Sequence, residues 1–273
     1  EPEDTSMACD GFPMLQPNGT IAAALSSPAG FTTDDTSFDE SDCSFVEEFG
    51  RVWCDLLVVI DGPAIPAGGG GGSSLCAAAA NPFTDLAPAG VHTPNVVCAA
   101  FLKLLAGGPG GAPDTVFGPV GTTTRGQLAT LVRNLLQAGG VPTPAFPANA
   151  FGDDDGSTHE WSINALTALG VVGGNGDAGS QFCPNRPATR AEIASFLHRA
   201  YGVIAGAPMA AGPNAFGDDD GHPAEGAINA LAAAGVIEGK APGVFDPGAT
   251  VTREQIATML VGLVQVLVGA GAW

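Results

Sequence analysis

Apolar residues recur at helical spacing in three stretches of the chain. The stretches are "TTRGQLATLVRNL" from Thr123, "ATRAEIASFLHRA" from Ala188 and "VTREQIATMLVGL" from Val251. In each stretch the apolar side chains follow one another at intervals of three and four residues, which is the spacing of one face of an α-helix. No single repeat is large enough to bury its stripe, so we expect the three helices to bury one another.

A capping pattern opens each of these stretches. A threonine is followed three residues later by glutamine or glutamate, the arrangement in which the two side chains satisfy each other's backbone N–H groups. The pairs are Thr124 with Gln127, Thr189 with Glu192, and Thr252 with Gln255. The sequence therefore predicts where all three helices begin.

A shorter helix is expected before each capped helix. "INALTALG" and "INALAAAG" end at Gly170 and Gly235, and glycine suits the left-handed conformation that ends many helices. The corresponding segment of the first repeat is "VVCAAFLKLLAGG". The turns "VFGP", "QFCP" and "VFDP" then lead to the capped helices. Self-similarity of this kind predicts a repeat architecture.

The first 74 residues differ from the repeats. Residues 1–62 hold thirteen acidic residues and one basic residue, Arg51. "VWCDLLVVIDG" is rich in β-branched and aromatic residues and predicts a strand, and "GGGGGSS" at 68–74 marks a boundary. We therefore divide the chain into an N-terminal region, 1–74, and three repeat segments, 75–140, 141–203 and 204–273.

Charge and cysteine content limit the class of protein. A net charge of −19 argues against nucleic acid as a partner, and no apolar run is long enough to predict a membrane span. Six cysteines without a Cys-x-x-Cys pair favour three disulfides over a zinc site, so we expect an exported protein. The cysteines are Cys9, Cys43, Cys54, Cys76, Cys98 and Cys183.

The order of these elements resembles the S-layer homology motif. "FCPNRPATRAEIASFLHRAYG" is similar to versions of this motif from high-GC Gram-positive bacteria (the actinobacterial type), and the motif covers 83–140, 151–203 and 216–270. The resemblance implies a mainly α fold, a pseudo-threefold spindle of three motifs around a central three-helix bundle. A small disulfide-stapled, partly β region would precede it. It also implies that grooves between motifs bind cell-wall polysaccharide, often bearing an acidic pyruvate ketal, and that the protein is secreted and held at the cell surface.

One arginine follows each capping threonine: Arg125, Arg190 and Arg253. A cation beside a helix N-terminus is unfavourable, so its repetition requires a reason. One interpretation is a bidentate clamp on an anionic sugar substituent, aided by the helix N-terminal N–H groups. The other is an ion pair with the aspartate of a neighbouring Phe-x-Asp turn. The resemblance implies a set of glycan-binding residues, with the family's aromatic and its Ala-Glu pair present only in the second repeat: Arg125, Arg190, Arg253, Trp161, Glu192 and Thr189.

Two Asp-Asp-Asp-Gly sequences, at 153–156 and 218–221, resemble the start of an EF-hand loop but lack its distal glutamate. They are interpreted either as turns that cap the short helices or as looser calcium sites built on Asp153, Asp155, Asp218 and Asp220, with Glu160 or Glu225. Calcium aside, no cofactor is expected. His92, His159 and His222 precede the three short helices, too far apart on such a body to share a metal.

No catalytic motif is present, so we expect a protein that is not an enzyme and has no catalytic residues. Two functions remain. The chain is either a structural subunit that binds copies of itself in a surface layer, sheath or filament, or a monomeric wall-polysaccharide anchor that displays its N-terminal region. A positive mean hydropathy of +0.23 favours assembly. A glycan-active enzyme is the third alternative.

Overall fold

Residues 43–46, 51–54, 75–108, 112–174 and 181–273 are described in the computed structural model of the chain, and they fall into two units. In the first unit, β1 (Cys43–Val46) pairs antiparallel with β2 (Arg51–Cys54), which places Cys43 opposite Cys54. β2 covers only the start of the predicted strand. The rest of that strand, the glycine-rich boundary and Cys9 lie outside the described residues.

The second unit alternates short and long helices. From Leu75 onward the described residues form helices and loops, with isolated β-bridges as the only extended pairing among them. The short helices are α1 (Thr93–Phe101), α3 (Glu160–Ala168) and α5 (Glu225–Ala233). The long helices are α2 (Arg125–Ala138), α4 (Arg190–Ala205) and α6 (Arg253–Gly269). We call α1–α2 repeat 1, α3–α4 repeat 2 and α5–α6 repeat 3.

All three predicted capping boxes are present. The hydroxyls of Thr124, Thr189 and Thr252 accept hydrogen bonds from the N–H three residues later, at 3.3, 3.3 and 3.4 Å. The Gln or Glu side chain at that third position accepts the threonine N–H in return, at 2.9–3.1 Å. Gly170 and Gly235 take the left-handed conformation after α3 and α5, as predicted (φ 70° and 71°). These local signals therefore set the ends of five helices.

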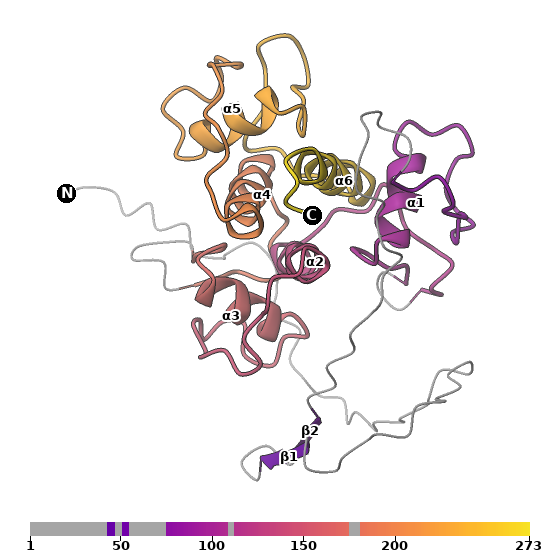
Figure 1. Cartoon of the computed structure of the whole chain (residues 1–273), viewed down its shortest axis with the longest axis vertical. Helices are drawn as coiled ribbons and strands as arrows, with labels where there is room; N and C mark the ends of the chain where they lie inside the picture. Colours follow the sequence, from indigo (N-terminus) through magenta and orange to yellow (C-terminus); the bar gives the residue numbers. More distant parts are fainter. Residues whose placement is uncertain (1–42, 47–50, 55–74, 109–111, 175–180) are drawn as a thin grey trace, which may run out of the picture. The chain divides into compact units, whose positions relative to one another are not determined.

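The long helices lie beside one another at the centre of this unit. α4 contacts both α2 and α6, and Figure 1 shows the three nearly end-on with the short helices outside them. Each long helix also contacts the short helix of another repeat, which gives three junctions: α2–α3, α4–α5 and α6–α1. The predicted apolar stripes are buried here, including Leu128, Val132, Leu135, Ile193, Phe196, Leu197, Ile256, Leu260 and Leu263.

The loops that lead into the long helices are joined in a cycle. Bridges pair Thr124 with Pro187, Thr189 with Thr250, and Thr122 with Thr252. Each bridge joins two different repeats, so repeat 1 is joined to 2, repeat 2 to 3, and repeat 3 back to 1. The N-terminal ends of the three long helices are therefore held together through the backbone.

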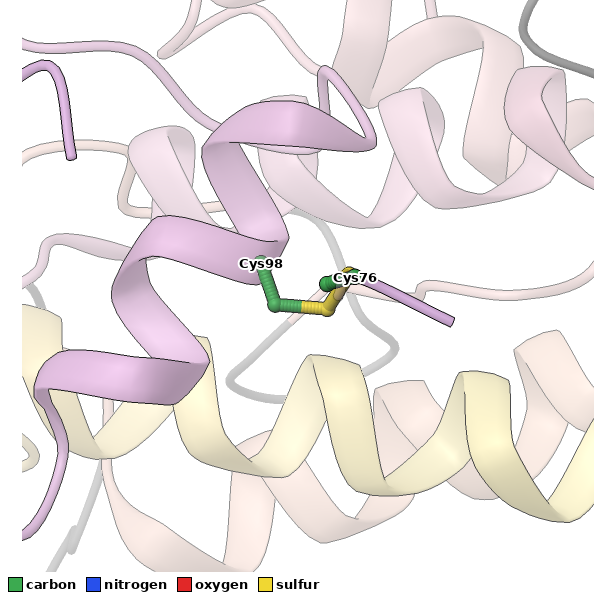
Figure 2. Close-up of a disulfide and its surroundings, with 2 residues drawn as sticks. All are labelled: Cys76 and Cys98. Atoms are coloured by element: carbon green, nitrogen blue, oxygen red, sulfur yellow. A yellow bond between two sulfur atoms is a disulfide. The ribbon is translucent and has the colours of Figure 1, made fainter. Parts of the chain in front are cut away.

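A disulfide joins Cys76 to Cys98 on α1, with the two Cα atoms 5.3 Å apart (Figure 2). It ties the segment that precedes repeat 1 to the first short helix. Cys183 is also disulfide-bonded. The expectation of disulfides is therefore confirmed for these residues. Within the described part of the chain, no helix has the length and hydropathy needed to span a membrane.

Candidate functional site

The side chain of Arg125, which is 2% exposed, crosses from repeat 1 into repeat 2. Its Nε donates to the carbonyl of Phe182 at 2.8 Å, and its Nη2 donates to the carbonyl of Gly173 at 3.3 Å. Nη1 donates to Glu192 at 2.6 Å, and the guanidinium stacks on the Phe182 ring, 4.6 Å from its centre. Burial lowers the pKa of Arg125, and the charge of Glu192 opposes this.

The other two arginines repeat this arrangement. Nε of Arg190 donates to the carbonyl of Phe245 at 2.7 Å in repeat 3, and Nε of Arg253 to that of Phe117 at 2.9 Å in repeat 1. Each guanidinium also stacks on the ring of the same phenylalanine, at 4.3 and 4.8 Å. The three arginines therefore connect the repeats in the same cyclic order as the bridges.

The first amides of the long helices have partners in the same loops. The N–H of Arg125 donates to the carbonyl of Arg186, that of Arg190 to Ala249, and that of Arg253 to Gly121, each at 2.9 Å. The next amide of each helix donates to the carbonyl of Pro184, Pro247 or Pro119, and the third donates to the capping threonine. Carbonyl oxygens of the neighbouring repeat therefore occupy the helix N-termini, where the clamp interpretation placed an anion.

The first aspartate of each Phe-x-Asp turn organises the loop that the arginine meets. Asp153 accepts the N–H groups of Phe182 and Cys183, at 2.8 and 2.6 Å, and Asp85 and Asp218 do the same in the other repeats. These backbone hydrogen bonds, that of Phe245 first, lower the pKa of Asp218. The aspartates thus hold the loop that each arginine meets. Burial lowers the pKa of Arg125, Arg190 and Arg253, and the charges of these aspartates oppose that effect.

Glu192 and Thr189 form the capping box of α4. Glu192 accepts from the Thr189 N–H with one oxygen and from Arg125 and Arg186 with the other. Of the three predicted arginines, Arg125 contacts this capping pair, and the contact joins repeat 1 to repeat 2. The geometry favours a joining role for this whole set.

Trp161 lies elsewhere, at the α2–α3 junction. Its indole N–H donates to the carbonyl of Ala145 at 3.0 Å, and the guanidinium of Arg133 lies 4.9 Å from its ring centre. Nε of Arg133 is buried without a hydrogen-bond partner, and no described carboxylate lies within ion-pair distance of this cation. Sequence analysis missed Arg133, although its place on α2, one turn after the apolar stripe begins, was visible.

A polar cluster extends the same junction. Thr130 Oγ1 lies 2.9 Å from His159 Nδ1 and donates to Ser162 at 3.2 Å. Burial lowers the pKa of His159, and the charge of Arg133 lowers it further, so the imidazole is neutral at pH 7. The α6–α1 junction has a similar cluster in which Thr258 contacts His92 at 2.8 Å.

Among the described residues, the pairing of Arg133 with Trp161 is not repeated at the other two junctions. The positions equivalent to Arg133 are His198 on α4 and Val261 on α6, and those equivalent to Trp161 are Gly226 and Pro94. His159 also explains why the first repeat departs from the motif at Gly126. A Cβ there would lie 2.8 Å from His159 Cδ2. The three histidines are less equivalent than expected, because the residue before α5 is Ala224 and not His222.

The predicted calcium ligands have other partners. Asp153 and Asp218 hold the loops described above, and Asp155 and Asp220 accept from Asn149 and Asn214 at 2.7 and 2.8 Å. In the part of the chain that the structure describes, no three acidic, His or Cys side chains form a metal-binding group.

The middle aspartates of the two clusters were missed. Asp154 and Asp219 are 0% exposed, and neither carboxylate has a hydrogen-bond partner. Burial raises the pKa of Asp154 to about 6, with Glu160 as the next cause. The signal that could have found them is Leu86, which stands at the same position after the Phe-x-Asp turn of repeat 1.

Comparison with known proteins identifies two of the repeats. A sequence profile of the S-layer homology domain matches residues 151–194 and 215–257, in repeats 2 and 3. The chain is also 27% identical over 158 residues to "Exoglucanase XynX" of Acetivibrio thermocellus. That alignment covers 57% of this chain and 14% of the relative, so the chain spans a small part of the protein it matches.

Proposed function

We propose that this S-layer homology domain protein is a non-enzymatic surface protein that binds an acidic cell-wall polysaccharide along the α2–α3 junction. S-layer homology domains associate proteins with the cell surface by binding cell-wall polysaccharide. The observation that carries the site is the pairing of Arg133 with Trp161. An aromatic face packs against sugar rings, and an arginine without a carboxylate partner suits an anionic substituent such as a pyruvate ketal.

The surroundings support a binding surface at this place. Phe146, which is 67% exposed, follows the residue whose carbonyl accepts the Trp161 N–H. Thr130, His159 and Ser162 form a hydrogen-bonded polar cluster at the same junction. In this proposal the glycan contacts predicted for the arginines after the capping threonines are replaced by contacts to Arg133, and Arg125, Arg190 and Arg253 keep the repeats in register.

The first repeat is proposed as a third motif of the same kind, and the three together as a pseudo-threefold spindle. Three features support this: equivalent capping boxes, equivalent arginine contacts and the cyclic loop bridges. We keep the boundaries 75–140, 141–203 and 204–273 as part of the proposal, with 1–74 as a separate region.

Wall binding is tested by cosedimentation with purified cell-wall sacculi, before and after acid removal of their attached polysaccharide. The wild type should pellet only with intact walls, and a soluble hexosamine bearing a pyruvate ketal should compete. Trp161→Ala and Arg133→Ala should each weaken binding at least about tenfold, which is the loss of one good contact. His198→Ala, at the equivalent place on α4, is the matched control. Full binding by both folded variants would refute this site.

A second candidate function is assembly with copies of itself. Val91, Val120 and Phe146 are 84%, 77% and 67% exposed, and apolar side chains this exposed favour contact with another surface. Sedimentation velocity and electron microscopy of the pure chain without wall distinguish the two functions. Ordered polymers would make it a structural subunit, and a monomer that pellets only with wall would make it an anchor.

Glycan hydrolysis is the remote alternative that the name of the relative suggests. Because the chain aligns with 14% of that protein, the alignment leaves most of it, and any catalytic part there, unmatched. Release of reducing sugar from xylan or cellulose by the pure chain would contradict a non-enzymatic role.

A further inference from the structure

The middle aspartates of the two Asp-Asp-Asp-Gly turns stand apart from every acid around them. Both oxygens of Asp154 and both of Asp219 are buried without a hydrogen-bond partner. The flanking acids do have partners: Asp153 and Asp155 before α3, and Asp218 and Asp220 before α5. The same group is thus left unsatisfied at the same place in two repeats.

A buried carboxylate without a partner is strongly unfavourable. Burial raises the pKa of Asp154 to about 6, and the charges of Glu160, Asp153 and Asp155 contribute to this rise. A group with that pKa is still mostly ionised at pH 7. No basic side chain of the described residues forms an ion pair with it. The turn therefore holds negative charge that no ion pair among the described residues neutralises.

The fold itself does not require an acid at this position. In repeat 1 the residue after the Phe-x-Asp aspartate is Leu86, which is 8% exposed and belongs to the hydrophobic core. A buried leucine therefore fits at this position of the repeat without any polar partner. Repeats 2 and 3 carry an aspartate there instead, a difference that packing in the core does not require.

We propose that Asp154 and Asp219 are each the central ligand of a calcium ion bound in the turn before α3 and before α5. Both lie close to solvent, because the residues on either side of them are exposed. Glu160 and Glu225 reach the same turns, where each accepts the N–H of Gly156 or Gly221 with one oxygen, at 2.7 and 2.8 Å. The second oxygen of each glutamate is then available to the ion.

The chemistry of the donors selects the ion. The available groups are carboxylates and main-chain carbonyls, an all-oxygen set that suits calcium or magnesium better than zinc or copper. Since no three acidic side chains of the described residues converge, carbonyls and water must complete the shell. Calcium accepts six to eight such ligands in irregular geometry, whereas magnesium requires a near-ideal octahedron.

The test is calorimetric titration of the full chain with calcium after removal of metals, with magnesium and zinc as comparison ions. We expect two calcium sites in the wild type, one in Asp154→Leu, one in Asp219→Leu and none in the double variant. The melting temperature of the wild type should rise with calcium, and that of the double variant should not. Asp246→Asn, which alters an exposed acid paired with Lys240, is the matched control and should keep both sites.

Leucine is the residue that repeat 1 uses, so the variants should fold, and Asp154→Asn serves as the isosteric substitute if one does not. No calcium binding by the wild type, or two sites remaining in the double variant, would overturn the proposal. The proposal would also fail if mild acid raised the melting temperature of the metal-free wild type and calcium did not change it. The aspartates would then be protonated in the folded protein and not bound to an ion. These outcomes are independent of wall binding.

Discussion

Replacing Arg125 by alanine distinguishes a structural arginine from a glycan clamp. The change removes the hydrogen bonds to Phe182, Gly173 and Glu192 and the guanidinium contacts with two phenylalanine rings, at a side chain that is 2% exposed. It also leaves Glu192 with one cation in place of two and leaves the carbonyl of Phe182 without its donor. Removing one partner of a buried ion pair costs about 3–5 kcal/mol. We therefore expect the free energy of unfolding to fall by about 4 kcal/mol.

The chain supplies its own controls. Arg253 occupies the equivalent place in repeat 3, is only half-buried and donates to two carbonyls. The charge of Asp85 lies nearby, but no described carboxylate forms an ion pair with Arg253, so Arg253→Ala should cost about 1–2 kcal/mol. Arg186 also pairs with Glu192, but its side chain is 35% exposed, so Arg186→Ala should cost less than about 1 kcal/mol. The expected order of destabilisation is Arg125, then Arg253, then Arg186.

Urea denaturation followed by circular dichroism measures these differences, with the slope of the transition checked for constancy. Wall binding is measured on the same variants at a temperature where all are folded. A decrease of less than about 1 kcal/mol in the free energy of unfolding of Arg125→Ala, combined with lost wall binding, would refute the structural role. It would support the interpretation of Arg125 as a clamp on an anionic sugar substituent.

Three further predictions concern other parts of the fold. Gly126→Ala should destabilise the chain by about 1–3 kcal/mol although alanine favours helices, because its Cβ would overlap His159, and adding His159→Ala should recover part of the loss in a double-mutant cycle. Replacing Cys76 and Cys98 by alanine should lower the free energy of unfolding in urea by about 3 kcal/mol, the value expected for a bond between residues 22 apart, and a loss near zero would contradict this. Burial and then the charge of Arg199 lower the pKa of His198, so its contribution to stability is present above the ordinary histidine pKa of about 6.5 and is lost as pH falls below it. Melting temperatures between pH 7.5 and 5 should therefore fall more steeply in the wild type than in His198→Gln, and parallel curves would show that His198 does not contribute.

The features that the sequence predicted well are local ones. Capping boxes and the glycines after α3 and α5 depend on residues a few positions apart, so the helix starts and ends could be predicted without knowing the rest of the fold. The apolar stripes were predicted for the same reason. Because the same stripe occurs in three repeats, the sequence also predicted that the long helices pack against one another, and α4 does contact both α2 and α6.

The features that the sequence did not indicate depend on contacts between repeats. Arg125 meets a carbonyl 57 residues away, and nothing near Arg125 in the sequence indicates that the loop around Phe182 lies over the start of its helix. The three aspartates of a cluster look alike in sequence, and only the fold shows that Asp154 is the one that is buried without a partner. Arg133 became a candidate binding residue only because its guanidinium lies over the ring of Trp161, which belongs to the next repeat.

The first amide of each long helix donates a hydrogen bond to the next repeat in a cycle, so the three repeats form a closed array. An open solenoid can gain or lose a unit at either end, because each unit contacts only its neighbours and the terminal units serve as caps. Here the amide of Arg253 donates to the carbonyl of Gly121, so repeat 3 is hydrogen-bonded back to repeat 1 although the two are far apart in the sequence. No unit is terminal, and removing one would leave the helix start of one remaining unit without its carbonyl acceptors. The number of repeats is therefore fixed by geometry, and the long sequence separation of the closing contacts predicts that closure is the slow step of folding.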